Sequence, residues 1–569
     1  MAELPTAGHR PRPVAAHPDP SPDLLRDPPG DLPDLLGRLV RRDPHAVVLV
    51  DRSPDGASLP VRRGELAARV RSLAAELAVA GVGPDGCVAV WLPNWSDTVV
   101  WQLAAAARGA HVVGLNTRYN VEEVAHVLRR ARPAVLALAV GFHGLDLLGT
   151  LRGAVAAAPK VPVPVVAPVT GPGRPAVDDP SRVDVGGGAW APGPVDAAAP
   201  EPPRGDPERL VAAFTTSGST GRPKLAAHTG AAVLAHAAAA ATALGIEDGD
   251  AVLCALPLSG VFGFNTAMAT LAAGGVCVLE PVFDAEAVLD DLAAHRVTHV
   301  VGGDDLVLRL HDAWTARPRA LPHWRWLGIA DFQRRARELA AWAEVTFGTV
   351  ATGLYGSSEV FALTSCWPAA EPAPSRWDAG GRVVLAQTAV RVADPSSGEV
   401  LPSGTEGELQ FRGPTVVDTY LGAPDVADTV FTADGWFRSG DLGVLVDDGA
   451  FVYVCRAGDA LRLRGFLVDP AEIELRLAAH PGVSAAKVVG VEGPDGATRA
   501  VAFVVPREGE AVGELQEWCA AGLARFKVPE AVHLVPGLPM TDGPNGLKVR
   551  TATLREWAAE RHGGHPAEP

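Results

Sequence analysis

The chain has 569 residues, 47% of them apolar, a mean hydropathy of +0.13 and a formal net charge of −16. This length allows two to four domains with a large core, and no apolar run approaches the roughly 18–20 residues of a membrane-spanning helix. The negative charge argues against non-specific binding of nucleic acid. The N-terminus, MAELPTAGHR, lacks a basic region followed by an apolar one, so we expect a cytoplasmic protein rather than a secreted one.

The cysteines and histidines indicate neither a metal centre nor disulfides. The sixteen histidines show no metal-ligand spacing, and the six cysteines form no CxxC pair. We therefore expect small buried thiols in a reducing compartment. The cysteines are Cys87, Cys254, Cys277, Cys366, Cys455 and Cys519.

Shifts in composition divide the chain. Residues 1–32 are rich in Pro, Asp and His without periodicity, which predicts a disordered leader. The Pro- and Gly-rich residues 161–207 predict a long surface loop or an insertion. We expect two domains, over residues 33–456 and 457–560, and a tail over residues 561–569.

In the first domain, apolar strands alternate with amphipathic helices. Apolar residues between positions 66 and 77 fall on one helical face. Cys87–Leu92 is then predicted as a strand, Ser96–Ala107 as a helix and His111–Leu115 as another strand. Such alternation indicates an α/β fold, with parallel sheets flanked by helices.

The end of the chain predicts a small α/β unit. A domain boundary is expected near Arg456–Asp459, because a strand pattern ends there and Leu461–Leu467 begins a new one. Ala485–Val491 and Arg499–Val505 are predicted as strands, and Gly513–Leu523 contains a predicted helix.

The stretch Thr215–Lys224, TTSGSTGRPK, is the most informative part of the chain. It follows an apolar run, Leu210–Phe214, that predicts a buried strand. Glycines let backbone N–H groups approach a phosphate, hydroxyls donate to its oxygens and lysine neutralises charge, so the composition indicates a polyphosphate-binding loop. Gly218, Gly221 and Lys224 are each three residues apart, which is not the Walker spacing. A flexible loop is the alternative that composition alone leaves open.

Four more motifs follow in order. They are Tyr355–Glu359 (YGSSE), Gly435–Gly443 (GWFRSGDLG), Arg456–Glu474 (RAGDALRLRGFLVDPAEIE) and Leu538–Lys548 (LPMTDGPNGLK). The first comes directly after a predicted strand, Thr349–Leu354, and ligands of open α/β sheets bind at the carboxyl ends of strands. Each motif alone also fits a turn or a solvated segment.

Together the five motifs resemble those of the acyl-adenylate-forming enzymes, which include acyl-CoA synthetases, peptide-synthetase adenylation domains and luciferases. The resemblance covers the chain from about residue 35 to about residue 558. It implies that the large N-terminal domain has a smaller β subdomain, and that a small mobile C-terminal α+β domain pivots over it. It also implies a reaction in two halves. A carboxylate and ATP give an acyl-adenylate and pyrophosphate, and a thiol, usually that of coenzyme A, then displaces AMP.

The resemblance also assigns roles to residues of the motifs. Lys548, Thr220 and Glu359 are the implied catalytic residues: Lys548 reaches the α-phosphate and the carboxylate, and Glu359 ligates Mg²⁺. Asp441 is expected to accept hydrogen bonds from the ribose hydroxyls, and Tyr355 to pack on adenine. The implied nucleotide-binding residues are Thr216, Ser217, Gly218, Ser219, Thr220, Gly221, Lys224, Tyr355, Gly356, Ser357, Ser358, Asp441 and Arg456.

Other positions concern the acid and the thiol. Gly465 matches a glycine that lets the pantetheine arm of coenzyme A pass close to the backbone. Gly260 stands where a histidine or an aromatic residue commonly borders the acyl pocket, so we expect a wide pocket, lined by Val261 and gated by Phe264. An apolar acid, fatty or otherwise, is the expected substrate, and nothing in the sequence offers a counter-ion for an α-amino group.

Besides Gly260, the chain departs from the family pattern at four positions. Gly230 replaces a histidine that commonly ends the phosphate-binding motif, Gly458 occupies the pivot, and Leu467 stands where arginine is frequent. Leu547 is an extra residue before Lys548, which puts the register of the lysine in question.

We therefore predict an ATP-dependent, AMP-forming acyl-CoA synthetase. One alternative is a ligase that loads the acyl group onto a carrier-protein thiol. The other is a non-catalytic sensor of nucleotide or acyl ligands, whose hallmark would be the loss of Lys548 or Glu359; both are present. We expect neither a nucleic-acid partner nor a transmembrane segment.

Overall fold

The computed structural model describes residues 29–191, 206–216, 224–423, 430–447, 449–457, 461–463, 466–468, 470–493, 498–523, 525–543 and 546–562. Nearly all of the predicted leader and all but the first two residues of the predicted tail lie outside these ranges. Among the described residues, no helix is both long and apolar enough to span a membrane.

The first layer is a six-stranded sheet with the order β6-β5-β3-β4-β7-β8. Its neighbouring strands are parallel except for the β7–β8 pair. Every residue of β3, β4 and β5 is buried, as expected where helices cover both faces. The strands are β3 (Cys87–Trp91), β4 (His111–Gly114), β5 (Val135–Ala139), β6 (Val165–Val169), β7 (Leu210–Thr216) and β8 (Lys224–Thr229). The associated helices are α2 (Leu32–Arg42), α3 (Arg63–Val79), α4 (Ser96–Ala107), α5 (Val121–Ala131), α6 (Leu147–Ala157) and the 3₁₀ helix η1 (Pro180–Val183).

The second layer is a thirteen-stranded sheet with the order β16-β17-β18-β19-β15-β14-β13-β12-β11-β9-β10-β1-β2. The strands from β13 to β1 in this order are parallel, whereas those from β14 to β16 are antiparallel and form a β subdomain. The strands are β1 (Val47–Arg52), β2 (Ser58–Arg62), β9 (Ala251–Cys254), β10 (Val276–Leu279), β11 (His299–Gly303), β12 (Trp326–Ala330), β13 (Val350–Tyr355), β14 (Ser365–Cys366), β15 (Gly380–Val383), β16 (Ala389–Ala393), β17 (Glu406–Arg412), β18 (Phe437–Asp447) and β19 (Ala450–Arg456).

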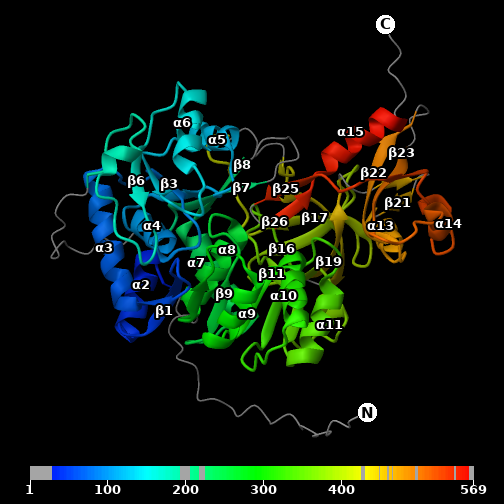
Figure 1. Ribbon diagram of the computed structural model, residues 1–569, viewed down its shortest axis with the longest axis horizontal. Coiled ribbons are helices and arrows are strands. Elements are labelled where there is room, and N and C mark those ends of the chain that lie inside the picture. Colours follow the sequence, from blue (N-terminus) through cyan, green and yellow to red (C-terminus); the bar gives the residue numbers. More distant parts are fainter. Residues whose placement is uncertain are drawn as a thin grey trace, which may run out of the picture.

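Helices α7 and α8 lie between the two sheets (Figure 1) and pack against each other. Their buried faces belong to the main apolar core, which both sheets share. The helices that follow the first sheet along the chain are α7 (Gly230–Leu244), α8 (Val261–Ala273), α9 (Ala285–Ala294), α10 (Asp304–Ala316), α11 (Ala336–Phe347) and the 3₁₀ helix η2 (Ser375–Trp377).

The residues from 461 onward build cores of their own, to which no earlier described residue contributes. In Figure 1 this part, orange to red, lies beside the larger N-terminal part, and the β25–β26 hairpin is directed back toward it. Its elements are β20 (Leu461–Leu463), β21 (Phe466–Val468), α13 (Pro470–Ala478), β22 (Val483–Glu492), β23 (Thr498–Pro506), α14 (Leu515–Ala520), η4 (Arg525–Lys527), β24 (Ala531–Leu534), β25 (Met540–Gly543), β26 (Gly546–Val549) and α15 (Thr551–His562).

The expected α/β fold class is confirmed, and so is the burial of all six cysteines. The loop expected over residues 161–207 is wrong in part, because Val165–Val169 forms the edge strand β6. Its Pro168 is compatible with this place, since an edge strand tolerates a residue without an N–H group. The helix predicted within Gly513–Leu523 is shorter than that stretch, spanning Leu515–Ala520. The domain boundary near Arg456 stays a prediction.

Candidate active site

A cleft of about 840 Å³ lies where the strand ends of the N-terminal part face the C-terminal part. One wall includes the last residues of β7, β12 and β13, namely Thr216, Ala330 and Tyr355. The opposite wall comes from α13, β22 and the β25–β26 hairpin. Parallel strands thus gather their carboxyl ends at one edge, where open α/β sheets bind their ligands.

The expected phosphate-binding loop connects β7 and β8, which pair with Thr216 opposite Lys224. Residues 217–223 lie outside the described residues. The predictions for Ser217, Gly218, Ser219, Thr220 and Gly221 fall on this stretch and stay predictions.

The flanks of this loop are described. Thr215 shares a hydrogen bond with Tyr119, with 2.5 Å between the two hydroxyl oxygens. Burial raises the pKa of Tyr119 to about 12, so its phenol stays protonated. The Lys224 ammonium lies 5.1 Å from the centre of the Tyr420 ring, a cation–π distance. The strand ends therefore present one oriented hydroxyl and one cation at the mouth of the loop.

The Tyr355–Glu359 motif follows β13 directly and lines the cleft. The Ser357 hydroxyl accepts a hydrogen bond from the Glu359 N–H at 3.2 Å. The Ser358 hydroxyl donates to the Thr215 carbonyl at 3.4 Å, which joins the motif to the end of β7. The Tyr420 hydroxyl donates to Oε1 of Glu359 at 3.4 Å.

Tyr420 was not predicted from the sequence, yet it contacts both the expected metal ligand and the expected phosphate lysine. Its ring makes a cation–π contact with Lys224, and its hydroxyl donates a hydrogen bond to Glu359. It is buried, and this desolvation raises its pKa. Tyr420 lies outside the motifs, in TYLG, and only the fold brings it here.

Asp441 lies on β18 opposite Arg456 of β19. The Tyr355 hydroxyl donates to Oδ2 of Asp441 at 2.6 Å, and Nε of Arg456 lies 3.1 Å from Oδ1. Burial raises the pKa of Asp441, while Arg456 and Tyr355 favour the ionised form. The coulombic field of Asp441 in turn raises the pKa of Arg456. The Tyr355 ring is stacked on Phe411 and stands edge-on to Phe451, so it is rigid.

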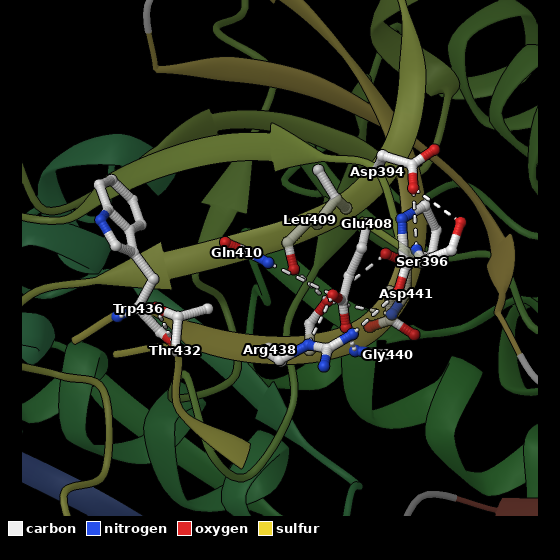
Figure 2. A network of polar contacts seen from close by, with 12 residues as sticks. Asp394, Ser396, Glu408, Leu409, Gln410, Thr432, Trp436, Arg438, Gly440 and Asp441 are labelled. Carbon is white, nitrogen blue, oxygen red and sulfur yellow. Dashed lines mark hydrogen bonds and ion pairs between the residues drawn. The ribbon is translucent and has the colours of Figure 1, made fainter. Parts of the chain in front are cut away.

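A second buried carboxylate supports the turn that carries Asp441 (Figure 2). Glu408 accepts hydrogen bonds from Nε of Arg438 at 2.9 Å and from the Gly440 N–H at 3.3 Å. The Ser439 hydroxyl donates to the Leu409 carbonyl at 2.5 Å and accepts from the Asp441 N–H at 3.0 Å. These contacts fix the backbone on which Asp441 sits, and they too were not predicted from the sequence.

An apolar part of the cleft is formed by Val261 and Phe262, in the first turn of α8, together with Ala362 and Leu363. Gly260 is the N-cap of α8 and is not among the described lining residues.

Phe264 points elsewhere. It packs on Phe214, with 5.1 Å between ring centres, and lines a separate inner cavity of about 20 Å³. The side chain next to the predicted Val261 in the cleft is thus Phe262, two residues earlier in the same helical turn.

The C-terminal wall carries the expected catalytic lysine on a hairpin. Lys548 pairs with Thr541 and the extra residue Leu547 with Asp542, both within the β25–β26 ladder. Met540 and Val549 of this hairpin line the cleft. The side chain of Lys548 lies outside the described part of the structure, as do Gly458 and Gly465.

Metal-ligating side chains do not cluster: no group of three or more is present among the described residues. A single hard-oxygen ligand such as Glu359 fits Mg²⁺, because this ion keeps several waters and is held largely by substrate phosphates.

The family model of the AMP-binding enzymes matches residues 38–421, and the model of their C-terminal domain matches residues 472–543. The chain belongs to this family. A feruloyl-CoA synthase of an Amycolatopsis species is 32% identical over 525 residues, 90% of this chain and 96% of that protein. A sulfoacetate–CoA ligase of Cupriavidus necator is 30% identical over 496 residues, 86% and 91% of the two chains. The structure of ATP-bound MatB from Rhodopseudomonas palustris has a TM-score of 0.78 and 26% identity, covering 93% of this chain and 99% of that one.

Membership of the AMP-binding enzymes confirms the expected class, an ATP-dependent ligase of an acid and a thiol with coenzyme A as co-substrate. The relatives act on acids as unlike as ferulate and sulfoacetate, by their names. The acid is therefore a property of each member's own cleft.

Proposed function

We propose that this AMP-binding enzyme activates a compact, apolar carboxylic acid as its adenylate and transfers the acyl group to coenzyme A. The observation that carries the proposal is one cleft in which Glu359, Asp441 and Arg456 lie together with an apolar wall of Phe262 and Leu363. Charged and hydrogen-bonding groups suit a nucleotide, and the apolar wall suits an acyl group.

A compact acyl group is favoured over a long fatty chain by the small size of the separate inner cavity farther along α8. Beyond the first turn of α8, Phe214 and Phe264 border a cavity of only about 20 Å³. A single water needs roughly 10–15 Å³ on this measure, so an alkyl chain finds no room there. Aromatic, alicyclic and short aliphatic acids are the proposed substrates.

In the first half-reaction an oxygen of the acid attacks the α-phosphorus of ATP, the bond from that phosphorus to the bridging oxygen breaks, and pyrophosphate leaves. Asp441 holds the ribose hydroxyls and Arg456 holds Asp441 ionised, while Lys548 carries positive charge toward the α-phosphate. When Mg²⁺ is bound, with Glu359 as its protein ligand, it neutralises charge on the phosphates.

In the second half-reaction the coenzyme A sulfur, as thiolate, attacks the acyl carbon, and the bond to the AMP oxygen breaks. The β25–β26 hairpin borders the cleft in this structure, so the arrangement suits the first half. We propose that the C-terminal part then rotates about Gly458 and brings Gly465 to the thiol. A carrier-protein thiol is the alternative acceptor.

The test is acid-dependent ATP–pyrophosphate exchange with purified protein, using benzoate, cinnamate, cyclohexanecarboxylate, butyrate, hexanoate and palmitate, followed by thioester formation with coenzyme A. We expect exchange with one or more of the compact acids and little with palmitate. Palmitate as the best substrate would refute the compact pocket. Exchange without any thioester would favour a carrier-protein acceptor, and no exchange with any acid would refute the function.

A further inference from the structure

The segment Ser358–Leu363, between β13 and β14, serves both ends of the cleft. Its first residues include Glu359, and its last residues, Ala362 and Leu363, form part of the apolar wall. Phe361 and Leu363 both have φ of 65°, in the left-handed region that residues with side chains rarely adopt. A conformation of this kind persists only when surrounding structure holds it.

Three buried side chains from other elements hold this segment by its carbonyl groups. Nε2 of His228, on β8, donates to the Ser358 carbonyl at 2.8 Å. Nδ2 of Asn265, on α8, donates to the Ala362 carbonyl at 2.8 Å. Nε2 of His236, on α7, donates to the Leu363 carbonyl at 3.3 Å.

The two histidines also clamp the strained residue between them. The ring of Phe361 stacks on His228, with 4.2 Å between ring centres, and meets His236 edge-on at 4.8 Å. Burial lowers the pKa of His228 to about 4 and that of His236 to about 3. Both rings are therefore neutral near pH 7, and the carbonyl acceptors fix their single N–H on Nε2.

We propose that these three residues position the segment for two separate tasks. His228 fixes the Ser358–Glu359 end, which serves the phosphates and Mg²⁺. Asn265 and His236 fix the Ala362–Leu363 wall and so determine which acids the cleft accepts. This rests on the proposed function, in which that wall receives the acyl group.

The test compares variants in two readouts: the ratio of kcat/KM between a preferred acid and a bulkier one, and the KM for ATP with the Mg²⁺ dependence. Asn265→Leu keeps the size of the side chain and removes the donor. We expect it to change the acid ratio at least tenfold, with the KM for ATP within twofold. His236→Leu should do the same, whereas His236→Gln, which keeps a donor, should restore the ratio.

His228→Leu should change the use of ATP and Mg²⁺ and leave the choice of acid unchanged. We expect the Mg²⁺ concentration for half-maximal activity, or the KM for ATP, to rise at least fivefold while the acid ratio stays within twofold. Thr270→Val is the matched control, because Thr270 is buried on α8 and its hydroxyl, among the described residues, donates to the Thr266 carbonyl of its own helix at 2.8 Å. It should move neither readout.

The proposal is overturned if Asn265→Leu leaves the acid ratio within twofold, or if Thr270→Val changes it equally. A parallel loss in both readouts for all three positions would also overturn it, since that result indicates general structural damage. Should Asn265→Leu not fold, Asn265→Ser gives the same test, because its hydroxyl is too short to reach the carbonyl. Wild-type protein that catalyses no exchange with any acid would instead refute the proposed function on which this inference rests.

Discussion

Replacing Tyr355 with phenylalanine removes one of the two groups that keep the buried Asp441 ionised. The lost contact is a hydroxyl-to-carboxylate hydrogen bond of 2.6 Å, within the short range of charge-assisted bonds. Hydrogen bonds to charged groups contribute roughly 1.5–3 kcal/mol, and the ring itself remains packed on Phe411. We therefore expect the free energy of unfolding to fall by roughly 1.5–3 kcal/mol.

The same change should weaken the use of ATP in a pH-dependent way. Burial already raises the pKa of Asp441, and Tyr355 opposes this rise, so the variant's pKa should be higher still. A carboxyl group with a raised pKa loses its negative charge at a higher pH as the solution is acidified. The acceptor that we propose for the ribose hydroxyls is then lost. We expect kcat/KM for ATP to fall roughly tenfold or more, the equivalent of about 1.4 kcal/mol or more, and to fall further at pH 6 than at pH 8.

The assay is pyrophosphate release against ATP concentration from pH 6 to pH 8, with thermal unfolding alongside. Tyr453→Phe is the matched control. Tyr453 lines the same cleft and its ring centre is 5.7 Å from that of Tyr355, but in the described part of the chain it forms no hydrogen bond to Asp441. Equal losses in the two variants, or a Tyr355→Phe loss that is the same at every pH, would refute the reasoning.

Four further changes test other parts of the molecule. Lys548→Ala should lower acid-dependent pyrophosphate release by roughly 10²–10³-fold or more while thiol attack on a supplied acyl-adenylate survives; equal loss of both halves would count against its role. Gly458→Pro should slow one half-reaction far more than the other by restricting rotation, and equal slowing would place the pivot elsewhere. Tyr420→Phe should raise the Mg²⁺ requirement only about two- to fivefold, since a hydrogen bond as long as 3.4 Å contributes roughly 0.5–1 kcal/mol. Tyr420→Leu should raise it further, and equal effects of the two variants would exclude a role for the ring. Burial raises the pKa of Glu280 to about 7 from 4.5, so its contribution to stability is full below pH 4.5 and is lost as pH rises through 7. Urea titrations should therefore find Glu280→Gln more stable than wild type at pH 8, by at most roughly 3 kcal/mol, with almost no difference at pH 4.

Local patterns made some of the fold predictable. Ser96–Ala107 is a helix with the predicted bounds, and Cys87–Trp91 and His111–Gly114 are strands within one residue of those predicted. Buried strands and amphipathic helices can be predicted from the period of their apolar residues. The edge strand Val165–Val169 was missed because its surrounding prolines and glycines dominate the composition, whereas pairing with β5 decides the conformation.

Part of the candidate site was predictable for the same kind of reason. Glu359, Asp441 and Arg456 were assigned from ordered motifs, and the structure brings all three to one cleft. The residues that hold these side chains in place were not predictable. Tyr420 contacts Glu359, and Glu408 accepts from the Gly440 N–H next to Asp441, yet both lie outside the recognised motifs.

The amino-acid sequence by itself determined the class of chemistry, because phosphate-binding and carboxylate groups must stand at fixed short spacings within contiguous motifs. Only the tertiary structure decided the shape of the proposed acid pocket. Its wall joins the first turn of α8 to Ala362 and Leu363, about a hundred positions later, and the buried tether from Asn265 that holds them together bonds a side chain to a backbone carbonyl. Every residue has the same backbone carbonyl, so the identity of a residue does not predict which carbonyl accepts such a bond.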